Sequence, residues 1–211
     1  MSQYRGDKSS RVLHLETQLT QLDYEKSLKA FDTVLNTMNR EAGFSRHDGS
    51  HYYYHLVDVA QILLNFSVRD DEIIAAALLH DFIEDIEWAT YEYVEEVYGK
   101  RVADIVLLVT KKPGIDYKVQ TDKMTEYLEN IEGSYESSLI KTADRMHNFG
   151  TMLNSSDAHR ARQVKETKEV FLPFFKRCRA KHVRYANFFF FAKTAIEPIL
   201  HEIERSLEKH K

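Results

Sequence analysis

The sequence predicts an all-α protein, and three observations lead to this expectation. Residues that break helices are sparse, with seven glycines and three prolines among 211 residues. Apolar side chains recur at the spacing of helix faces along most of the chain. No segment shows the sustained alternation of apolar and polar residues that marks a half-buried strand. We therefore expect a bundle of helices joined by short loops.

The N-terminal half contains four segments with helical spacing of apolar residues. The segment GFSRHDGS, residues 43–50, is expected to be a loop, because it combines two glycines, two serines and an aspartate. Asp70 or Asp71 can cap the helix expected over residues 72–85. The expected helices are 11–22, 25–41, 55–66 and 72–85.

The C-terminal half continues in the same way. Thr90 opens a helix that has acidic residues in its first turns and stops at Gly99. Pro113 and Gly114 lie in a connecting segment, and Pro173 marks the end of a later helix. The tail is expected to form one long helix or two. The further expected helices are 101–110, 120–131, 138–153, 158–171 and 180–209.

Length and composition narrow the class of protein. A chain of 211 residues favours a single domain, residues 1–211. The net charge of −4 argues against a nucleic-acid partner. The longest aromatic run, residues 188–192, is far shorter than a membrane span, and the N-terminus lacks an apolar signal segment. The single cysteine, Cys178, fits a reducing compartment, so we expect a cytoplasmic protein.

The stretch ALLHDFIEDIEW, residues 77–88, carries four ionisable groups at the end of an apolar helix. Residues four apart share a helix face, so His80 would lie over Glu84 and Asp81 over Asp85. A solvated helix end with a satisfied histidine would explain a lone pair of this kind. Two further segments make that explanation insufficient.

The first segment is KTADRMHNFGTML, in which four polar residues fall on one stripe of a helix flanked by apolar residues. The second segment is SRHDGSHYYYHLVDVA, in which a loop that carries Arg46 leads into His55. Two imidazoles and two carboxylates form a mixed set of ligands that suits Mn, Fe, Zn or Co better than Ca. The absence of thiolates argues against a structural zinc site. The stripe consists of Asp144, His147, Asn148 and Thr151.

Four blocks resemble the HD-domain phosphohydrolases, and more closely the hydrolase domain of the RelA/SpoT alarmone enzymes. They occur in the family's order, with a weaker fifth echo at residues 165–173. The resemblance implies an HD-domain helical bundle with a metal at its centre, a hydrolase core at 24–176 and a helical extension at 177–211. Among members of this family, the chain resembles a stand-alone small alarmone hydrolase. The blocks are RHDGSHYYYH (46–55), LLHDFIED (78–85), VTK (109–111) and KTADRMHN (141–148).

The resemblance also implies a reaction and a set of roles. The family removes the 3′-diphosphate of (p)ppGpp, releasing pyrophosphate and GDP or GTP, usually with Mn2+. A metal-activated water would attack the phosphorus, and Glu84 or Asp85 would take its proton. By the same resemblance the metal ligands are His55, His80, Asp81 and Asp144. The substrate-binding residues are Arg46, Tyr52, Asn148 and Thr151.

Several positions depart from the family pattern. His47 and Asp48 replace the usual lysine and serine of the loop, so an adenosine alarmone, (p)ppApp, or a 3′-phosphorylated dinucleotide is an alternative substrate. His51 is expected at the loop surface rather than on the metal. Lys141 and Arg145 adjoin Asp144 and are expected either as surface ion-pair partners or as phosphate ligands.

The cellular role and the aromatic tail leave alternatives open. The enzyme would lower alarmone levels, or act as an antitoxin to a toxic alarmone synthetase. The rival hypotheses are an HD phosphohydrolase of other nucleotides, such as dNTPs, and a catalytically inactive nucleotide-binding regulatory module. Phe188 to Phe191 cover a whole helical turn. They are interpreted as part of a buried helix, with a homodimer interface as the alternative.

Overall fold

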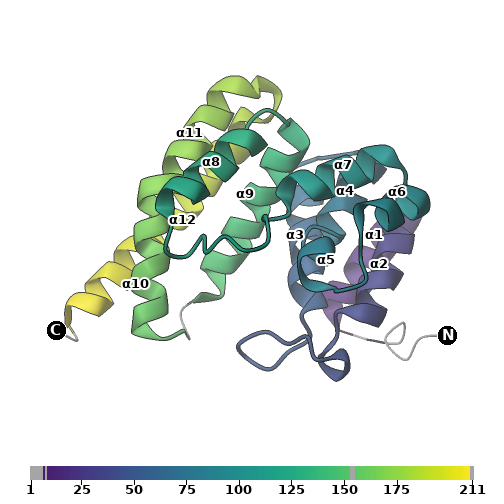
Figure 1. Cartoon of the computed structure of the whole chain (residues 1–211), viewed down its shortest axis with the longest axis horizontal. Helices are drawn as coiled ribbons and strands as arrows, with labels where there is room; N and C mark the ends of the chain where they lie inside the picture. Colours follow the sequence, from purple (N-terminus) through teal and green to yellow (C-terminus); the bar gives the residue numbers. More distant parts are fainter. Residues whose placement is uncertain (1–6, 8, 153–154, 210–211) are drawn as a thin grey trace. The chain divides into compact units, whose positions relative to one another are not determined.

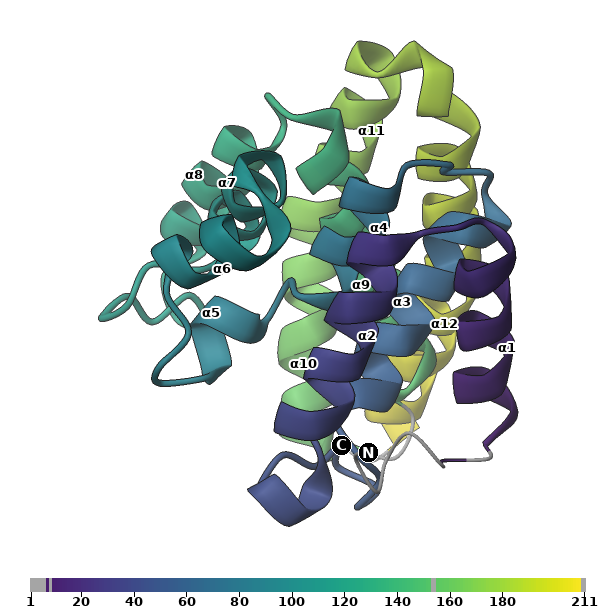
Figure 2. The ribbon, with the colours of Figure 1, turned by 90° about the vertical axis from the view of Figure 1, so that its right-hand side faces the viewer.

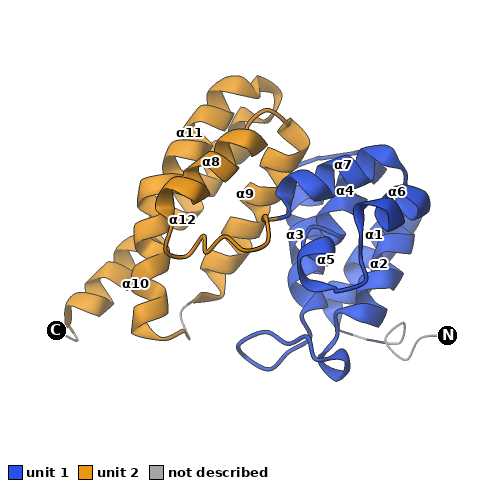
Figure 3. Ribbon diagram, viewed as in Figure 1, with its two compact units in different colours: residues 1–110 blue, residues 111–211 orange. Residues whose placement is uncertain are grey.

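The computed structural model describes residues 7, 9–152 and 155–209, and these residues are helical apart from loops and one isolated bridge between Ser45 and His51 (Figure 1). The expected all-α class is therefore confirmed. The described chain divides into two compact units, residues 1–110 and residues 111–211 (Figure 3).

The first unit is organised around one apolar helix, α4. Its residues from Ile73 to Leu78 are all buried, and it packs against α2, α3 and α7. A helix that is apolar on every side must be covered on every side, so α4 becomes the core of this unit. The elements are α1 (Ser10–Gln21), α2 (Glu25–Thr37), η2 (Arg40–Ala42), α3 (Tyr53–Asn65), α4 (Asp71–Leu78), α5 (Phe82–Asp85), α6 (Tyr91–Tyr98) and α7 (Lys100–Val109).

Capping interactions determine where these helices begin. The Asp70 side chain accepts hydrogen bonds from the backbone N–H groups of Glu72 and Ile73, so Asp70 caps α4. The neighbouring Asp71 carboxylate accepts from the backbone N–H groups of Lys26 and Ser27 and thereby satisfies the first turn of α2. The caps expected at Thr90 and Gly99 also occur: Thr90 accepts from the N–H of Tyr93, and Gly99 has φ 94°.

The expected helix over residues 72–85 is interrupted, which corrects the sequence-based prediction. Leu79 and Asp81 have ψ values of 6° and 1°, and α5 begins only at Phe82. In an uninterrupted helix the carbonyl of Ala77 would accept from the backbone N–H of Asp81. Here the Ala77 oxygen instead accepts from Nδ1 of His80 at 2.8 Å. His80 and Asp81 therefore lie in the break, and Glu84 and Asp85 lie on a separate short helix.

The second unit is organised around α9, which packs against α8, α11 and α12. Ser134 caps α9, which begins at Tyr135, three residues before the expected start, and ends at Gly150. Leu153, the expected end, lies outside the described residues. Figures 1 and 2 show α11 and α12 side by side. The elements are α8 (Thr121–Ile131), α9 (Tyr135–Gly150), α10 (Asp157–Glu166), η4 (Thr167–Phe171), α11 (Leu172–Lys181), η5 (Val183–Tyr185) and α12 (Ala186–Lys209).

The sequence predicted a helix that ends near Pro173, but the chain remains helical through this proline. It passes through a π-helical turn, η4, in which the N–H of Leu172 donates to the carbonyl of Thr167, five residues earlier. A proline inside an α-helix lacks a donor, and its ring clashes with the carbonyl four residues earlier. The wider turn just before Pro173 relieves this clash, so the chain continues directly into α11.

The tail forms one long helix, α12, after the short turn η5. Phe188 and Phe189 are buried, whereas Phe190 and Phe191 are 46% and 45% exposed. The interpretation as part of a buried helix therefore holds for two of the four phenylalanines, and the alternative, a homodimer interface on this helix, stays a prediction. No helix in the described part of the chain is long and apolar enough to cross a membrane.

Candidate functional site

His55 is positioned by the loop that precedes α3. The loop closes on itself, because the backbone N–H of Tyr52 donates to Phe44 O at 3.2 Å and the N–H of Tyr53 donates to Met38 O at 3.0 Å. These bonds fix the start of α3, and His55 follows in its first turn with a side chain that is 1% exposed. An imidazole buried this deeply needs polar partners.

Those partners come from the break between α4 and α5. Oδ2 of Asp81 lies 3.1 Å from Nε2 of His80 and 3.7 Å from Nε2 of His55. His80 is as deeply buried as His55, and the two rings meet edge to face with centroids 5.2 Å apart. His55, His80 and Asp81 form the one group of three or more histidines, cysteines and carboxylates in the described chain that could hold a metal ion.

This group suits a divalent metal in two respects. The carbonyl oxygen of Ala77 can only accept, so Nδ1 of His80 carries the hydrogen and Nε2 offers its lone pair toward Asp81. Two donors that are each about 2.1 Å from one ion lie about 3 Å apart at a right angle and about 3.4 Å apart at a tetrahedral angle. The observed separations of 3.1 and 3.7 Å are close to these values.

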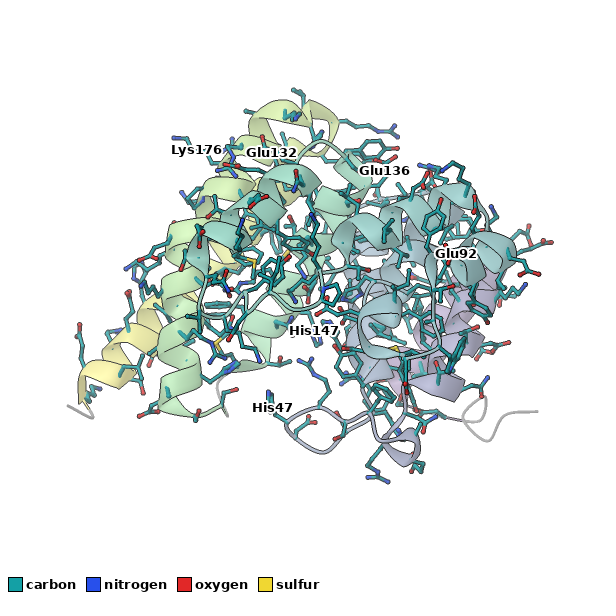
Figure 4. The ribbon with its side chains drawn as sticks, viewed as in Figure 1. His47, Glu92, Glu132, Glu136, His147 and Lys176 are labelled. Carbon is teal, nitrogen blue, oxygen red and sulfur yellow. The ribbon has the colours of Figure 1, made fainter. Side chains whose placement is uncertain are left out.

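Tyr52 and Arg46 extend the group toward the loop. The hydroxyl of Tyr52 donates to Oδ2 of Asp81 at 2.7 Å, and the Arg46 guanidinium lies 5.8 Å from the centroid of the Tyr52 ring. Asp48 accepts from the backbone N–H and the hydroxyl of Ser50, and these bonds lower the pKa of the Asp48 carboxyl. Asp48 therefore shapes the loop, while the exposed His47 projects from it (Figure 4).

The expected catalytic pair, Glu84 and Asp85, lies on α5, and both residues are exposed. Trp88 follows this helix and is 54% exposed. Its ring meets the buried ring of Phe82 edge to face at 5.4 Å. Because Phe82 is the residue directly after Asp81, the break, α5 and Trp88 form one continuous local structure.

His51, expected at the loop surface, is half-buried and holds the loop in place. Its Nδ1 accepts from the backbone N–H of Arg40 at 3.2 Å, and its ring stacks on that of Tyr53 with centroids 4.7 Å apart. His51 is not a member of the metal-binding group. Its position four residues before His55 therefore serves the fold of the loop.

The remaining candidates belong to the second unit. Asp144 is buried on α9, with Oδ2 2.8 Å from Nζ of Lys141 and Oδ1 accepting from the amide of Asn148. Asn148 therefore shares a face with Asp144, as its spacing predicted. Thr151 is the exposed C-cap of α9, and its hydroxyl donates to the carbonyl of His147, which is labelled in Figure 4.

Lys141 and Arg145 are buried, which corrects the alternative that placed them at the surface, while their alternative role as phosphate ligands stays a prediction. Lys141 pairs with Asp144, while Arg145 donates to Glu166 at 2.9 Å and to Thr167. The Arg145 guanidinium also lies 4.1 Å from the centroid of the Phe171 ring. Burial lowers the pKa of Arg145, and the carboxylate of Glu166 opposes this effect. The spacing of three between Lys141 and Asp144 was the available signal for their pairing.

Comparisons with known proteins agree with this arrangement. The sequence profile described as "HD domain" matches residues 30–179, which is most of the chain. The chain belongs to the HD-domain family.

Among curated relatives, the bifunctional (p)ppGpp synthase/hydrolase SpoT of Escherichia coli (strain K12) is 34% identical over 146 residues, 67% of this chain and 20% of the relative. The GTP pyrophosphokinase rsh of Brucella ovis is 30% identical over 151 residues, 70% of this chain and 20% of the relative. The chain therefore spans about a fifth of the length of these relatives.

A solved structure described as "A metazoan ortholog of SpoT hydrolyzes ppGpp and plays a role in starvation responses" matches with a TM-score of 0.55. The match covers 94% of this chain and 96% of the other, at 21% sequence identity. At this identity the likeness concerns the fold alone. The two chains thus share this fold over most of their lengths.

Proposed function

We propose that this chain is a metal-dependent hydrolase that removes the 3′-diphosphate of an alarmone nucleotide, converting (p)ppGpp to GDP or GTP and pyrophosphate. The observation that carries the proposal is the group formed by the buried His55 and His80 with the partly buried Asp81, followed at once by the exposed carboxylates of α5. The names of the curated relatives, which include a (p)ppGpp synthase/hydrolase, support this choice of substrate. The same reaction would serve either to lower alarmone levels or as an antitoxin to a toxic alarmone synthetase.

The two imidazoles and Asp81 would hold the ion, for which we expect Mn2+, and Asp144 is the proposed fourth ligand. A bound divalent ion supplies a Lewis acid for the phosphate and an acidified water. Glu84 or Asp85 would accept the proton of the attacking water. Their exposure on α5 supports this role, because a general base must reach both water and substrate.

The remaining residues would hold the nucleotide. Arg46 is proposed to contact the base, with Tyr52 beside it, and Asn148 and Thr151 to contact ribose and phosphate. The loop around Arg46 uses Asp48 for its own turn and presents His47 where the family commonly has lysine. We therefore expect the loop to determine the choice between ppGpp and ppApp.

The direct test is hydrolysis of ppGpp and ppApp with Mn2+, with products separated by chromatography. The wild type should release pyrophosphate together with GDP or ADP. Asp81→Asn and the double variant Glu84→Gln/Asp85→Asn should each lower kcat by at least 100-fold, because they remove a metal ligand and both candidate proton acceptors without changing side-chain size. Glu87→Gln is the matched control, since Glu87 is exposed on the segment just after α5.

Each outcome has a clear meaning. Loss of turnover in both site variants, with Glu87→Gln unchanged, would establish the reaction. Turnover of neither nucleotide by a Mn2+-bound wild type would redirect the search to other 3′-phosphorylated nucleotides. Full activity in Asp81→Asn would contradict the proposed metal centre.

A further inference from the structure

Tyr52 makes a contact that the family resemblance did not predict. The resemblance groups it with the substrate-binding residues, yet its hydroxyl donates to Oδ2 of Asp81 at 2.7 Å. That oxygen is also the atom that lies 3.1 and 3.7 Å from the two imidazole nitrogens. The tyrosine therefore touches the metal-binding group at the atom where its members meet.

The hydrogen bond restricts how Asp81 can turn. The Asp81 side chain is 16% exposed and lies in the break between α4 and α5, so the regular helix backbone does not fix its direction. A phenolic hydroxyl can donate one hydrogen, and here it donates to the oxygen that faces both imidazoles. The carbonyl of Ala77 orients His80 in the same manner, through Nδ1. Groups of this kind, outside the ligands themselves, set ligand orientation in metal sites.

The ring of Tyr52 has a second neighbour. The Arg46 guanidinium lies 5.8 Å from its centroid, within the range of a cation–π interaction. The same side chain thus contacts Asp81 through its hydroxyl and Arg46 through its ring. Both contacts lie within the first unit, on residues that the loop before α3 and the break after α4 hold in place.

We propose that Tyr52 is a positioning residue of the metal centre, which orients Asp81 through its hydroxyl and supports Arg46 through its ring. This inference depends on the proposed metal-dependent function and adds a separate role for each part of the side chain. The hydroxyl sets metal affinity, and the ring sets nucleotide affinity. Replacing one part at a time therefore separates the two effects.

The first measurement is Mn2+ affinity without nucleotide, read from the electron paramagnetic resonance signal of free Mn2+. Tyr52→Phe should bind Mn2+ about 10- to 100-fold more weakly than the wild type, the usual cost of losing an outer partner of a metal ligand. Tyr54→Phe is the matched control, because Tyr54 lies on the same turn and carries the Arg11 guanidinium 4.7 Å from its ring centroid. It should bind Mn2+ as the wild type does.

The second measurement is GDP affinity at saturating Mn2+. Tyr52→Phe keeps the ring and should bind GDP like the wild type. Tyr52→Leu removes the ring and should bind GDP about 2- to 5-fold more weakly, the fold-change expected for an exposed cation–π contact. Circular dichroism melting of all variants checks that each is folded.

The outcomes separate this inference from the proposed function. The positioning role alone would be overturned if the wild type hydrolyses ppGpp and Tyr52→Phe binds Mn2+ with an affinity within two-fold of the wild-type affinity. A wild type that neither binds Mn2+ nor hydrolyses ppGpp would overturn both. Weakened Mn2+ binding in Tyr52→Phe but not in Tyr54→Phe would support the inference.

Discussion

Asp81 and Asp144 are two buried or nearly buried carboxylates from the two units, and their surroundings differ in kind. Asp81 is surrounded by two imidazole nitrogens and a tyrosine hydroxyl. Asp144 has the ammonium group of Lys141 2.8 Å from one oxygen and the amide of Asn148 at the other. One carboxylate is grouped with other potential metal ligands, whereas the other already has a cation beside it.

The difference shows what each carboxylate gains from a metal ion. The imidazole nitrogens near Asp81 offer lone pairs to a cation, so a divalent ion would satisfy all three groups at once. The Lys141 ammonium already compensates the charge of Asp144 within its own helix, and the side chains are 7% and 10% exposed. We therefore expect Asp81 to dominate metal binding and the Lys141–Asp144 pair to dominate the stability of the second unit.

The largest effect on stability is expected when the Lys141–Asp144 pair is broken. Lys141→Met removes the ammonium group from a buried carboxylate and should lower the free energy of unfolding by about 3–5 kcal/mol. Urea unfolding in the presence of a chelator measures this loss. The double variant Lys141→Met/Asp144→Asn should recover much of it, because it leaves no unpaired ion.

The single cysteine offers an independent measurement of the same loss. Burial raises the pKa of the Cys178 thiol to about 11, so at pH 8 the folded protein should react slowly with thiol reagents. Lys141→Met should speed this labelling by roughly 100-fold or more, in proportion to the population of opened molecules. A loss of stability below about 1 kcal/mol, with unchanged labelling, would contradict the role given to the pair.

A smaller effect is expected from adding the metal. Mn2+ at 100 times its dissociation constant should raise the free energy of unfolding of the wild type by about 2.7 kcal/mol, because it binds the folded chain. Asp81→Asn should lose this gain. Asp144→Asn sharpens the contrast. If this variant loses the stabilisation by Mn2+, Asp144 is a ligand of the same ion as Asp81. If it keeps the stabilisation, the ion is bound by His55, His80 and Asp81 without Asp144.

The smallest effect concerns the partly exposed ion pairs of Glu72 with Lys26 and Arg101. Hydrogen bonds from Lys26 and Arg101 hold the pKa of Glu72 below its ordinary value of 4.5. Glu72 therefore contributes stability that is fully present above about pH 4.5 and is lost as the pH falls through the lowered value. Glu72→Gln should cost at most about 1 kcal/mol at pH 7, since all three side chains are partly solvated.

Urea unfolding of Glu72→Gln at several pH values tests this sign. The difference from the wild type should be constant between pH 6 and 8 and should shrink as the medium becomes more acidic than about pH 4. A difference that grows toward acidic pH would contradict the assignment. Glu87→Gln, which removes an exposed carboxylate, is the control and should show little change.

The helical class and the meeting of His55 with His80 and Asp81 could be predicted from the sequence. Sparse breakers and regular apolar spacing indicated helices, and the adjacent His-Asp pair resembled a known block. The caps at Asp70 and Thr90 followed from local chemistry, because their side chains satisfy nearby N–H groups. These features depend on residues that are close together in the chain or on a recognisable motif.

Other features depend on contacts that local patterns do not encode. No glycine or proline marks the break at residues 79–81, which coincides with the bond from the His80 ring to a backbone carbonyl. Pro173 predicted a helix end, yet the π turn before it lets the helix continue. The burial of Arg145 depends on Glu166 and Thr167, about 20 residues later in the chain, and such a pairing becomes visible only in three dimensions.

The edge-to-face packing of Trp88 on Phe82 has a practical consequence. Trp88 is the one tryptophan in the sequence, and the ring that it touches belongs to the residue next to Asp81. The tryptophan fluorescence of the protein therefore originates beside α5, from a partly solvated indole. A rearrangement of this short helix on addition of a metal ion or a nucleotide would thus change an optical signal of the unlabelled chain, on the timescale of a stopped-flow experiment.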